Sequence, residues 1–258
     1  MGIKDYRVIS TKTNEANLYY KDGFVYKIYK PCVIRSPYFI RDHIQLMKDR
    51  EKKVAILKEI DLPNTVMPID SIYDRSGNFA GYSMRYIPNV PLRSFDFGNS
   101  KKFLCVIRSC SETLRLIHEH PAKLCVGDMH FGNIILDGVL KPYYIDCDSW
   151  SIGKIDGAVC MEYFKFTQRK KRACKVSSNS DNISLFINTY KYLLGNKDFE
   201  CIDEYDYDQL AEQSSFLKNS KEIFHVLSRK GFRIAKVPYI DEFIDIDQPE
   251  EIVLSKKR

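Results

Sequence analysis

The sequence predicts an α+β protein with two lobes, a small and mostly antiparallel β lobe with one main helix and a larger, mainly helical lobe. β-branched and aromatic runs fill the first third of the chain around one segment of helical periodicity, and helical patterns dominate afterwards. Both patterns break at Pro88-Asn89-Val90-Pro91. We therefore expect one domain over residues 1–258, with an N-lobe at 1–87 and a C-lobe at 88–258.

The first lobe is expected to contain five strands and one helix. Asp22-Gly23 has the composition of a two-residue hairpin turn between two strands. Apolar residues then recur at spacings of three and four until Leu62-Pro63 ends the pattern, which predicts a helix. The expected strands span 6–10, 17–20, 24–30, 65–73 and 79–87, and the expected helix spans 37–60.

The second lobe begins with a helix whose apolar stripe lies between residues 101 and 120. Two short apolar runs follow, and Asp137-Gly138 between them predicts a hairpin. Later helical patterns span 182–194, 208–217 and 219–229.

Composition narrows the classes of protein that fit this chain. Of its 258 residues, 44% are apolar and 13% aromatic, which is enough for a packed core. No apolar run approaches the roughly 18 residues of a membrane helix, and the first residues lack a secretory signal. None of the eight cysteines forms a C-x-x-C pair, so we expect free thiols. Together with the lack of a membrane helix and of a secretory signal, this predicts no membrane association and a cytoplasmic location.

The segment that carries chemistry is Val126-Gly127-Asp128-Met129-His130-Phe131-Gly132-Asn133. Asp128 precedes Asn133 by five residues, and Asp146 follows the predicted hairpin thirteen residues after Asn133. Phosphoryl transfer needs a carboxylate to orient the acceptor hydroxyl and oxygen ligands to hold the metal-bound phosphates. These three side chains supply that set.

The spacing resembles the catalytic core of the protein-kinase-like superfamily. The resemblance implies ATP and Mg²⁺ as cofactors, Asp128 as the catalytic residue, and Asn133 and Asp146 as metal ligands. It also implies that Lys27, on the strand 24–30, holds the ATP phosphates.

The residues at the other positions of the motif resemble those in particular branches of that superfamily. The form G-D-x-H-x-x-N at 127–133 is similar to aminoglycoside and choline phosphotransferases and to atypical bacterial protein kinases. Asp146-Cys147-Asp148-Ser149 stands where D-F-G is usual. Asp148 there is either a further metal or water contact or a solvated loop residue.

Two features depart from the family pattern. The loop 11–17 contains no glycine, although glycines normally allow backbone amides to approach the phosphates. The helix glutamate that pairs with the strand lysine is also not obvious, because alignment places Lys53 at its position. Glu51, two residues away, is the expected substitute, and Asp49, one turn before Lys53 on the same helix face, is the alternative.

The segment Tyr82–Pro88 resembles the hinge that binds adenine through its main chain. Met84 is then the gatekeeper, and Arg85 and Ile87 are the backbone contacts. Further along, Asp181 fits both a brace for the catalytic loop and a helix N-cap.

The stretch between Asp146 and Asp181 contains the basic block Arg169-Lys170-Lys171-Arg172. In this position such a block is expected to receive an acidic or phosphorylated segment of a protein substrate. One four-residue block is a small footprint for nucleic acid, so that reading is disfavoured.

Three functions stay open at this point. The leading one is an ATP- and Mg²⁺-dependent Ser/Thr protein kinase. The second is a small-molecule kinase of the aminoglycoside or choline type, which rests on the G-D-x-H-x-x-N form of the loop. The third is a pseudokinase scaffold, which rests on the glycine-free loop and the uncertain helix glutamate.

Overall fold

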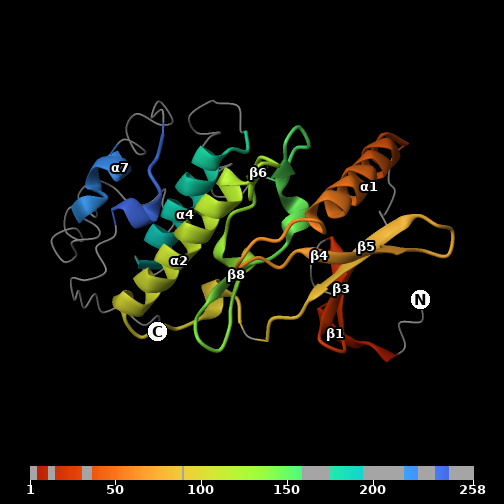
Figure 1. Ribbon diagram of the computed structural model, residues 1–258, viewed down its shortest axis with the longest axis horizontal. Helices are drawn as coiled ribbons and strands as arrows, with labels where there is room; N and C mark the ends of the chain where they lie inside the picture. Colours follow the sequence, from red (N-terminus) through yellow and green to blue (C-terminus); the bar gives the residue numbers. More distant parts are fainter. Residues whose placement is uncertain are drawn as a thin grey trace. The chain divides into compact units, whose positions relative to one another are not determined.

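The structure is a computed structural model with α+β architecture, built around a five-stranded antiparallel sheet (Figure 1). It forms two compact units, one comprising the chain up to Pro88 with Tyr144–Ser149, the other comprising Asn89–Tyr143 and the chain from Trp150 onward. The structure describes residues 5–10, 15–30, 37–88, 90–158, 175–193, 218–225 and 236–243.

The sheet of the first unit has the strand order β1-β2-β3-β5-β4. Asp22 and Gly23 both have positive φ, 49° and 85°, at the turn between β2 and β3, which confirms the hairpin turn expected there. The five strands that the sequence predicts are all present. They are β1 (Arg7–Ser10), β2 (Ala16–Lys21), β3 (Phe24–Tyr29), β4 (Pro68–Tyr73) and β5 (Phe79–Arg85).

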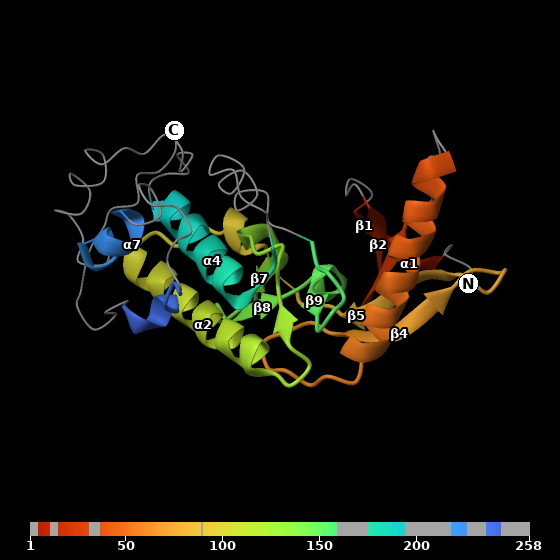
Figure 2. The same ribbon diagram turned by 90° about the horizontal axis from the view of Figure 1, so that it is seen from above.

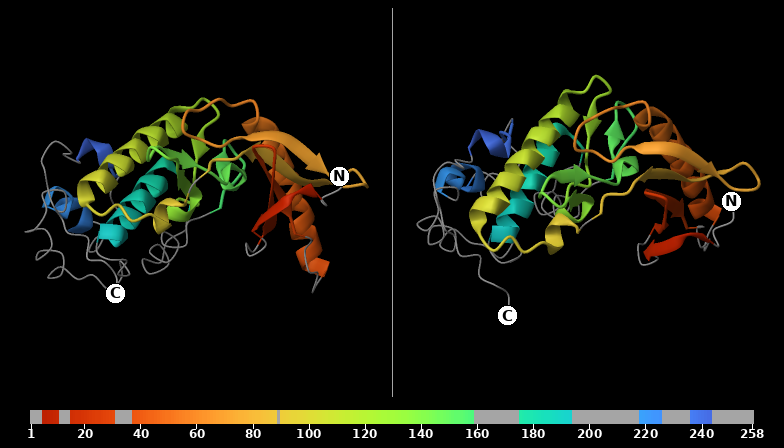
Figure 3. Two further views of the ribbon diagram at one scale, coloured as in Figure 1. Left: turned by 90° about the horizontal axis from the view of Figure 1, so that it is seen from below. Right: turned by 60° about the horizontal axis from the view of Figure 1, so that its bottom comes forward.

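The helix of this unit, α1, spans Pro37–Leu57 and runs along one face of the sheet (Figure 3). It buries Val54 and Leu57 completely. The sequence placed its end at Ile60, but the last residues form tighter turns, in which the Ile60 amide donates to the carbonyl of Leu57 at 3.1 Å.

In the second unit, α2 (Ser100–Glu119) and α4 (Ser178–Leu193) lie side by side (Figure 2). Asn99 caps α2, since its side chain accepts a hydrogen bond from the Lys102 amide at 2.9 Å. The apolar stripe predicted for this helix is buried, with Phe103, Ile107 and Leu114 fully enclosed. The smaller elements are η2 (Leu92–Ser94), α7 (Lys221–His225) and η8 (Ile240–Glu242).

Short strands carry the chain through the motif region. They are β6 (Leu124–Cys125), β7 (Ile134–Leu136), β8 (Pro142–Tyr144) and β9 (Ser151–Ile152), with the 3-10 turns η3 (Phe131–Asn133) and η4 (Cys147–Ser149). β7 pairs with β8, as the predicted hairpin requires, and β6 pairs with β9.

Part of the helical prediction for the second lobe falls on residues that the structure does not describe. The expected helix at 208–217 lies outside the described residues, and α7 covers only part of the one expected at 219–229. A mainly helical second lobe therefore stays a prediction. No described helix combines the length and apolar character that crossing a membrane requires.

Candidate functional site

The first group of functional side chains begins on β3. Burial alternates along this strand, so Val25, Lys27 and Tyr29 share its buried face. Lys27 pairs in register with Tyr82 on β5. Only 6% of Lys27 is exposed, so its ammonium group needs partners inside the protein.

Those partners lie in the segment 144–149, which main-chain hydrogen bonds attach to the first unit. The Val66 amide donates to the Tyr144 carbonyl at 2.8 Å, and the Tyr144 amide donates to the Asn64 carbonyl at 2.9 Å. Asp146 then has a positive φ of 63°, and Ser149 Oγ donates to its carbonyl at 2.8 Å. This turn directs the carboxylates of Asp146 and Asp148 at the same lysine.

Lys27 Nζ donates to Oδ1 of Asp146 and, at 2.7 Å, to Oδ1 of Asp148. Two tyrosine hydroxyls also donate to Asp148, Tyr82 at 2.6 Å and Tyr29 at 2.5 Å. We call these five residues the Asp148 cluster. Asp148 is 2% exposed, so of the two alternatives left open for it, that of a solvated loop residue is wrong.

The charges in this cluster support one another. Burial opposes ionisation of Asp148, but the charge of Lys27 and the hydrogen bonds from Lys27, Tyr29 and Tyr82 outweigh it and hold its pKa well below the usual range. Burial also opposes the charge on Lys27, yet the carboxylates of Asp148 and Asp146 raise its pKa. The cluster therefore holds an ammonium ion beside carboxylate at neutral pH.

Asp146 differs from Asp148 in its surroundings. Its side chain is 32% exposed, and among the described residues Lys27 is the side chain that donates to it. Burial and the neighbouring charge of Asp148 raise the pKa of Asp146, although Lys27 acts in the opposite direction. A hard cation would compensate that repulsion, so Asp146 fits a metal ligand better than Asp148 does.

The second group lies in the other unit, on the loop 126–133. Asn133 Nδ2 donates to the main-chain oxygen of Asp128 at 3.0 Å and approaches its Oδ2 at 3.4 Å. No donor among the described residues contacts Asn133 Oδ1, so that oxygen remains available to a ligand. The sequence-predicted pair is thus brought together, with the amide nitrogen of Asn133 holding the aspartate.

His130 stands beside this pair. Its Nδ1 accepts a hydrogen bond from the Gly132 amide at 3.0 Å, so the neutral ring carries its proton on Nε2. Nε2 lies 3.6 Å from Asp128 Oδ2, and both side chains are partly exposed. Asp128 is therefore accessible, with an imidazole nitrogen close to one of its oxygens.

The start of α4 braces this loop. Asp181 accepts hydrogen bonds from the amides of Val126 and Gly127, at 2.7 Å and 2.8 Å. This confirms the brace expected from the sequence. The N-cap expectation is wrong, because Ser177 and Ser180 cap α4 reciprocally, each amide donating to the other's hydroxyl.

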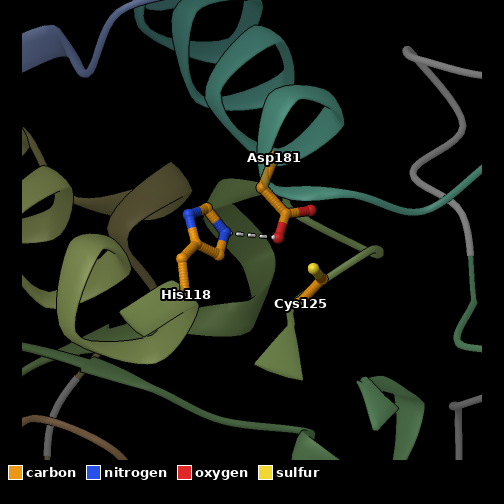
Figure 4. A group of neighbouring side chains, drawn as sticks. All are labelled: His118, Cys125 and Asp181. Carbon is orange, nitrogen blue, oxygen red and sulfur yellow. Dashed lines mark hydrogen bonds and ion pairs between the residues drawn. The ribbon is translucent and has the colours of Figure 1, made fainter. Parts of the chain in front are cut away.

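Asp181 also contacts a histidine in a group that has the chemistry of a metal site (Figure 4). The ligand atoms of His118, Cys125 and Asp181 lie within 4.8 Å of one another. Asp181 Oδ2, however, accepts from His118 Nε2 at 3.0 Å, and the Tyr239 hydroxyl donates to His118 Nδ1 at 2.8 Å. Since protein partners already occupy the ring nitrogens of His118 and Oδ2 of Asp181, these two residues act as a support for the loop.

The other predicted binding residues occupy separate places in the first unit. Glu51 lies beside Tyr73, where it raises the pKa of that hydroxyl, and does not belong to the Asp148 cluster. Met84 and Ile87 are buried, whereas the Arg85 side chain is exposed at the end of β5. Residues 11–14 of the glycine-free loop and the block Arg169–Arg172 lie outside the described residues.

Tyr29 and Tyr82 are the site residues that the sequence reasoning missed. Tyr29 stands two positions after Lys27, so the alternation of β3 places both side chains on one face. The sequence spacing alone could therefore have identified Tyr29. The register that sets Tyr82 opposite Lys27 could not be predicted from spacing, because it depends on the pairing of β3 with β5.

Comparison of the chain with models of known protein families gives no match, and comparison with curated proteins gives none either.

Proposed function

We propose that the chain is an ATP- and Mg²⁺-dependent phosphotransferase with a two-lobed, protein-kinase-like fold, and that it phosphorylates serine or threonine hydroxyls of a protein. The observation that carries the proposal is the ion pair between Lys27 and Asp146, which lie 119 positions apart. These are the residues to which the resemblance assigns the phosphates and the metal. A lysine that holds phosphates must stand beside the carboxylate that binds their cation.

The oxygen donors suit Mg²⁺, which prefers carboxylate and carbonyl ligands. Asp146 offers a partly exposed carboxylate, and Asn133 offers the amide oxygen that the protein leaves unpaired among its described residues. When bound, Mg²⁺ would neutralise charge on the phosphates of ATP.

The remaining steps belong to the chain's own side chains. Lys27 contacts the phosphates as a fixed positive charge. Asp128 orients the acceptor hydroxyl and accepts its proton, while the amide of Asn133 and the braced turn at Gly127 keep the aspartate in place. Main-chain groups at Arg85 and Ile87, beside Met84, would bind adenine, as the resemblance implies.

The test is transfer of radiolabelled γ-phosphate from ATP to the chain itself or to a generic protein. We expect transfer by the wild type and a loss of about 10²–10⁴-fold in Asp128→Ala. Asp156→Ala, an exposed aspartate of the same unit, is the matched control and should transfer normally. Undiminished transfer by Asp128→Ala would refute the role of this residue.

Two other results would select the alternatives. Consumption of ATP with a cationic or sugar alcohol, and none with proteins, would indicate a small-molecule kinase. Absence of a thermal shift at millimolar Mg-ATP would indicate a binding scaffold, because a ligand that binds the folded state raises its melting temperature.

A further inference from the structure

Asp148 is a buried carboxylate to which the proposed mechanism assigns no step. It contacts Lys27 and two tyrosines, and Arg50 Nε on α1 lies 3.9 Å from its Oδ2. An ionised carboxylate accepts about four hydrogen bonds, so Asp148 has little capacity left for a metal. Its neighbour Asp146 retains that capacity.

The sheet fixes where this carboxylate sits. Tyr29 and Lys27 project from the same face of β3, and Tyr82 faces Lys27 from β5. Three donors on two hydrogen-bonded strands therefore converge on one acceptor. Because strand register is rigid, Asp148 is held by groups that do not depend on the position of α1.

The helix contributes positive charge to the same place. The guanidinium of Arg50 lies 4.4 Å from the centre of the Tyr29 ring, and Lys53 Nζ lies 3.4 Å from the main-chain oxygen of Asp148. Glu51, the acidic residue expected to pair with Lys27, instead lies beside Tyr73 and raises the pKa of its hydroxyl. In the described part of the chain, α1 gives Lys27 no carboxylate.

We propose that Asp148 is the positioning residue for Lys27 and performs the task that a helix glutamate was expected to perform, with Tyr29 and Tyr82 as its anchors. This inference rests on the proposed function, because it concerns the lysine that holds the ATP phosphates. Of the two carboxylates on Lys27, Asp148 sets the position of the ammonium group, and Asp146 is left to the cation.

The experiment has one readout of lysine position and one of nucleotide binding. Labelling of Lys27 by an amine-reactive reagent, followed by peptide mass spectrometry, reports its exposure without any ligand. The Michaelis constant (KM) for ATP and kcat report how well Lys27 binds the nucleotide and supports turnover. Asp148→Asn removes the charge, and Tyr82→Phe removes one anchor in case Asp148→Asn fails to fold. Asp61→Asn and Tyr19→Phe are matched controls on the same unit.

We expect Asp148→Asn to raise Lys27 labelling and the KM for ATP by about tenfold, with a smaller change in the same direction for Tyr82→Phe. Asp148→Glu should restore part of the affinity. A purely structural role would instead lower kcat in proportion to the folded fraction and leave KM unchanged. Glu51→Gln should leave Lys27 labelling at the wild-type level.

The outcomes separate the two proposals. Unchanged Lys27 labelling and KM in folded Asp148→Asn and Tyr82→Phe, or release of Lys27 by Glu51→Gln, would overturn the positioning role while leaving the phosphotransferase intact. A wild type that binds no Mg-ATP would overturn the proposed function, and Asp148 would then be only an anchor of the fold.

Discussion

Lys27 donates a hydrogen bond of 2.7 Å to Asp148, although 121 positions separate these residues in the chain. The pair is buried, and each partner compensates the desolvation of the other. The carboxylate comes from the turn after β8, whereas α1 brings Arg50 and Lys53 to the same region. The sign of the charge that the helix supplies is thus the reverse of the one expected from the resemblance.

Gly127 is expected to tolerate no side chain. Its φ is +68°, and a Cβ would lie 2.2 Å from the carbonyl oxygen of Ala158. Gly127→Ala should therefore lower the free energy of unfolding by roughly 2 kcal/mol or more, measured by urea denaturation. Gly138→Ala is the control, since a Cβ there meets nothing within 4 Å. Equal stability of the two variants would contradict the geometry of the turn.

Removal of the Asp181 carboxylate should destabilise the second unit. Asp181→Ala leaves the buried amides of Val126 and Gly127 without an acceptor, at a cost of about 3 kcal/mol. Thermal or urea unfolding gives the measurement, with the exposed Asp156→Ala as control. Hydrogen exchange should also become faster at these two amides. Preserved protection at both would show that another group accepts their hydrogen bonds.

The reciprocal serine cap of α4 gives a smaller effect. Ser177→Ala removes the acceptor of the Ser180 amide and should cost about 1 kcal/mol of stability. Ser178→Ala, at the exposed first helical position, should be close to neutral. If Ser178→Ala lowered the free energy of unfolding as much as Ser177→Ala does, the helix would have to start at another residue.

Cysteine reactivity should depend on pH in a residue-specific way. Burial, with the nearby charge of Asp181, raises the pKa of the Cys125 thiol to about 12. The thiolate is the reactive form, so below that pKa the alkylation rate should rise about tenfold per pH unit.

At pH 8, iodoacetamide should therefore modify the exposed Cys105 long before Cys125, as peptide mass spectrometry would show. The buried Cys110 serves as the control for intact folding and should stay unmodified. Equal rates at Cys105 and Cys125 would exclude the raised pKa.

The β-rich unit could be predicted well from the sequence because its signals are local. Alternation along β3 and the Asp22-Gly23 turn depend on neighbouring residues, and both appear in the structure. Asp128 and Asn133, singled out by their spacing of five residues, lie on one short loop, and the structure shows a hydrogen bond between them. Local pattern thus accounts for most of the elements described here.

The surroundings of Asp148 could not be predicted in this way. Its burial depends on Tyr29, Tyr82 and Lys27, which reach it from strands more than sixty positions earlier in the chain. From its neighbours in the sequence alone, an aspartate in a polar turn is expected to be exposed to solvent. For the same reason Asp181 was ambiguous, since its amide donors lie 54 and 55 positions away.

The hydrogen bonds from the amides of Val126 and Gly127 to Asp181 also set the order in which parts of the chain can fold during synthesis. The ribosome completes the loop 126–133 first, and 54 positions separate Gly127 from the carboxylate that holds it. A nascent chain that stops short of Asp181 therefore contains every residue of the loop but lacks its anchor. Translation must reach the first turn of α4 before the segment that carries Asp128 can take its final conformation.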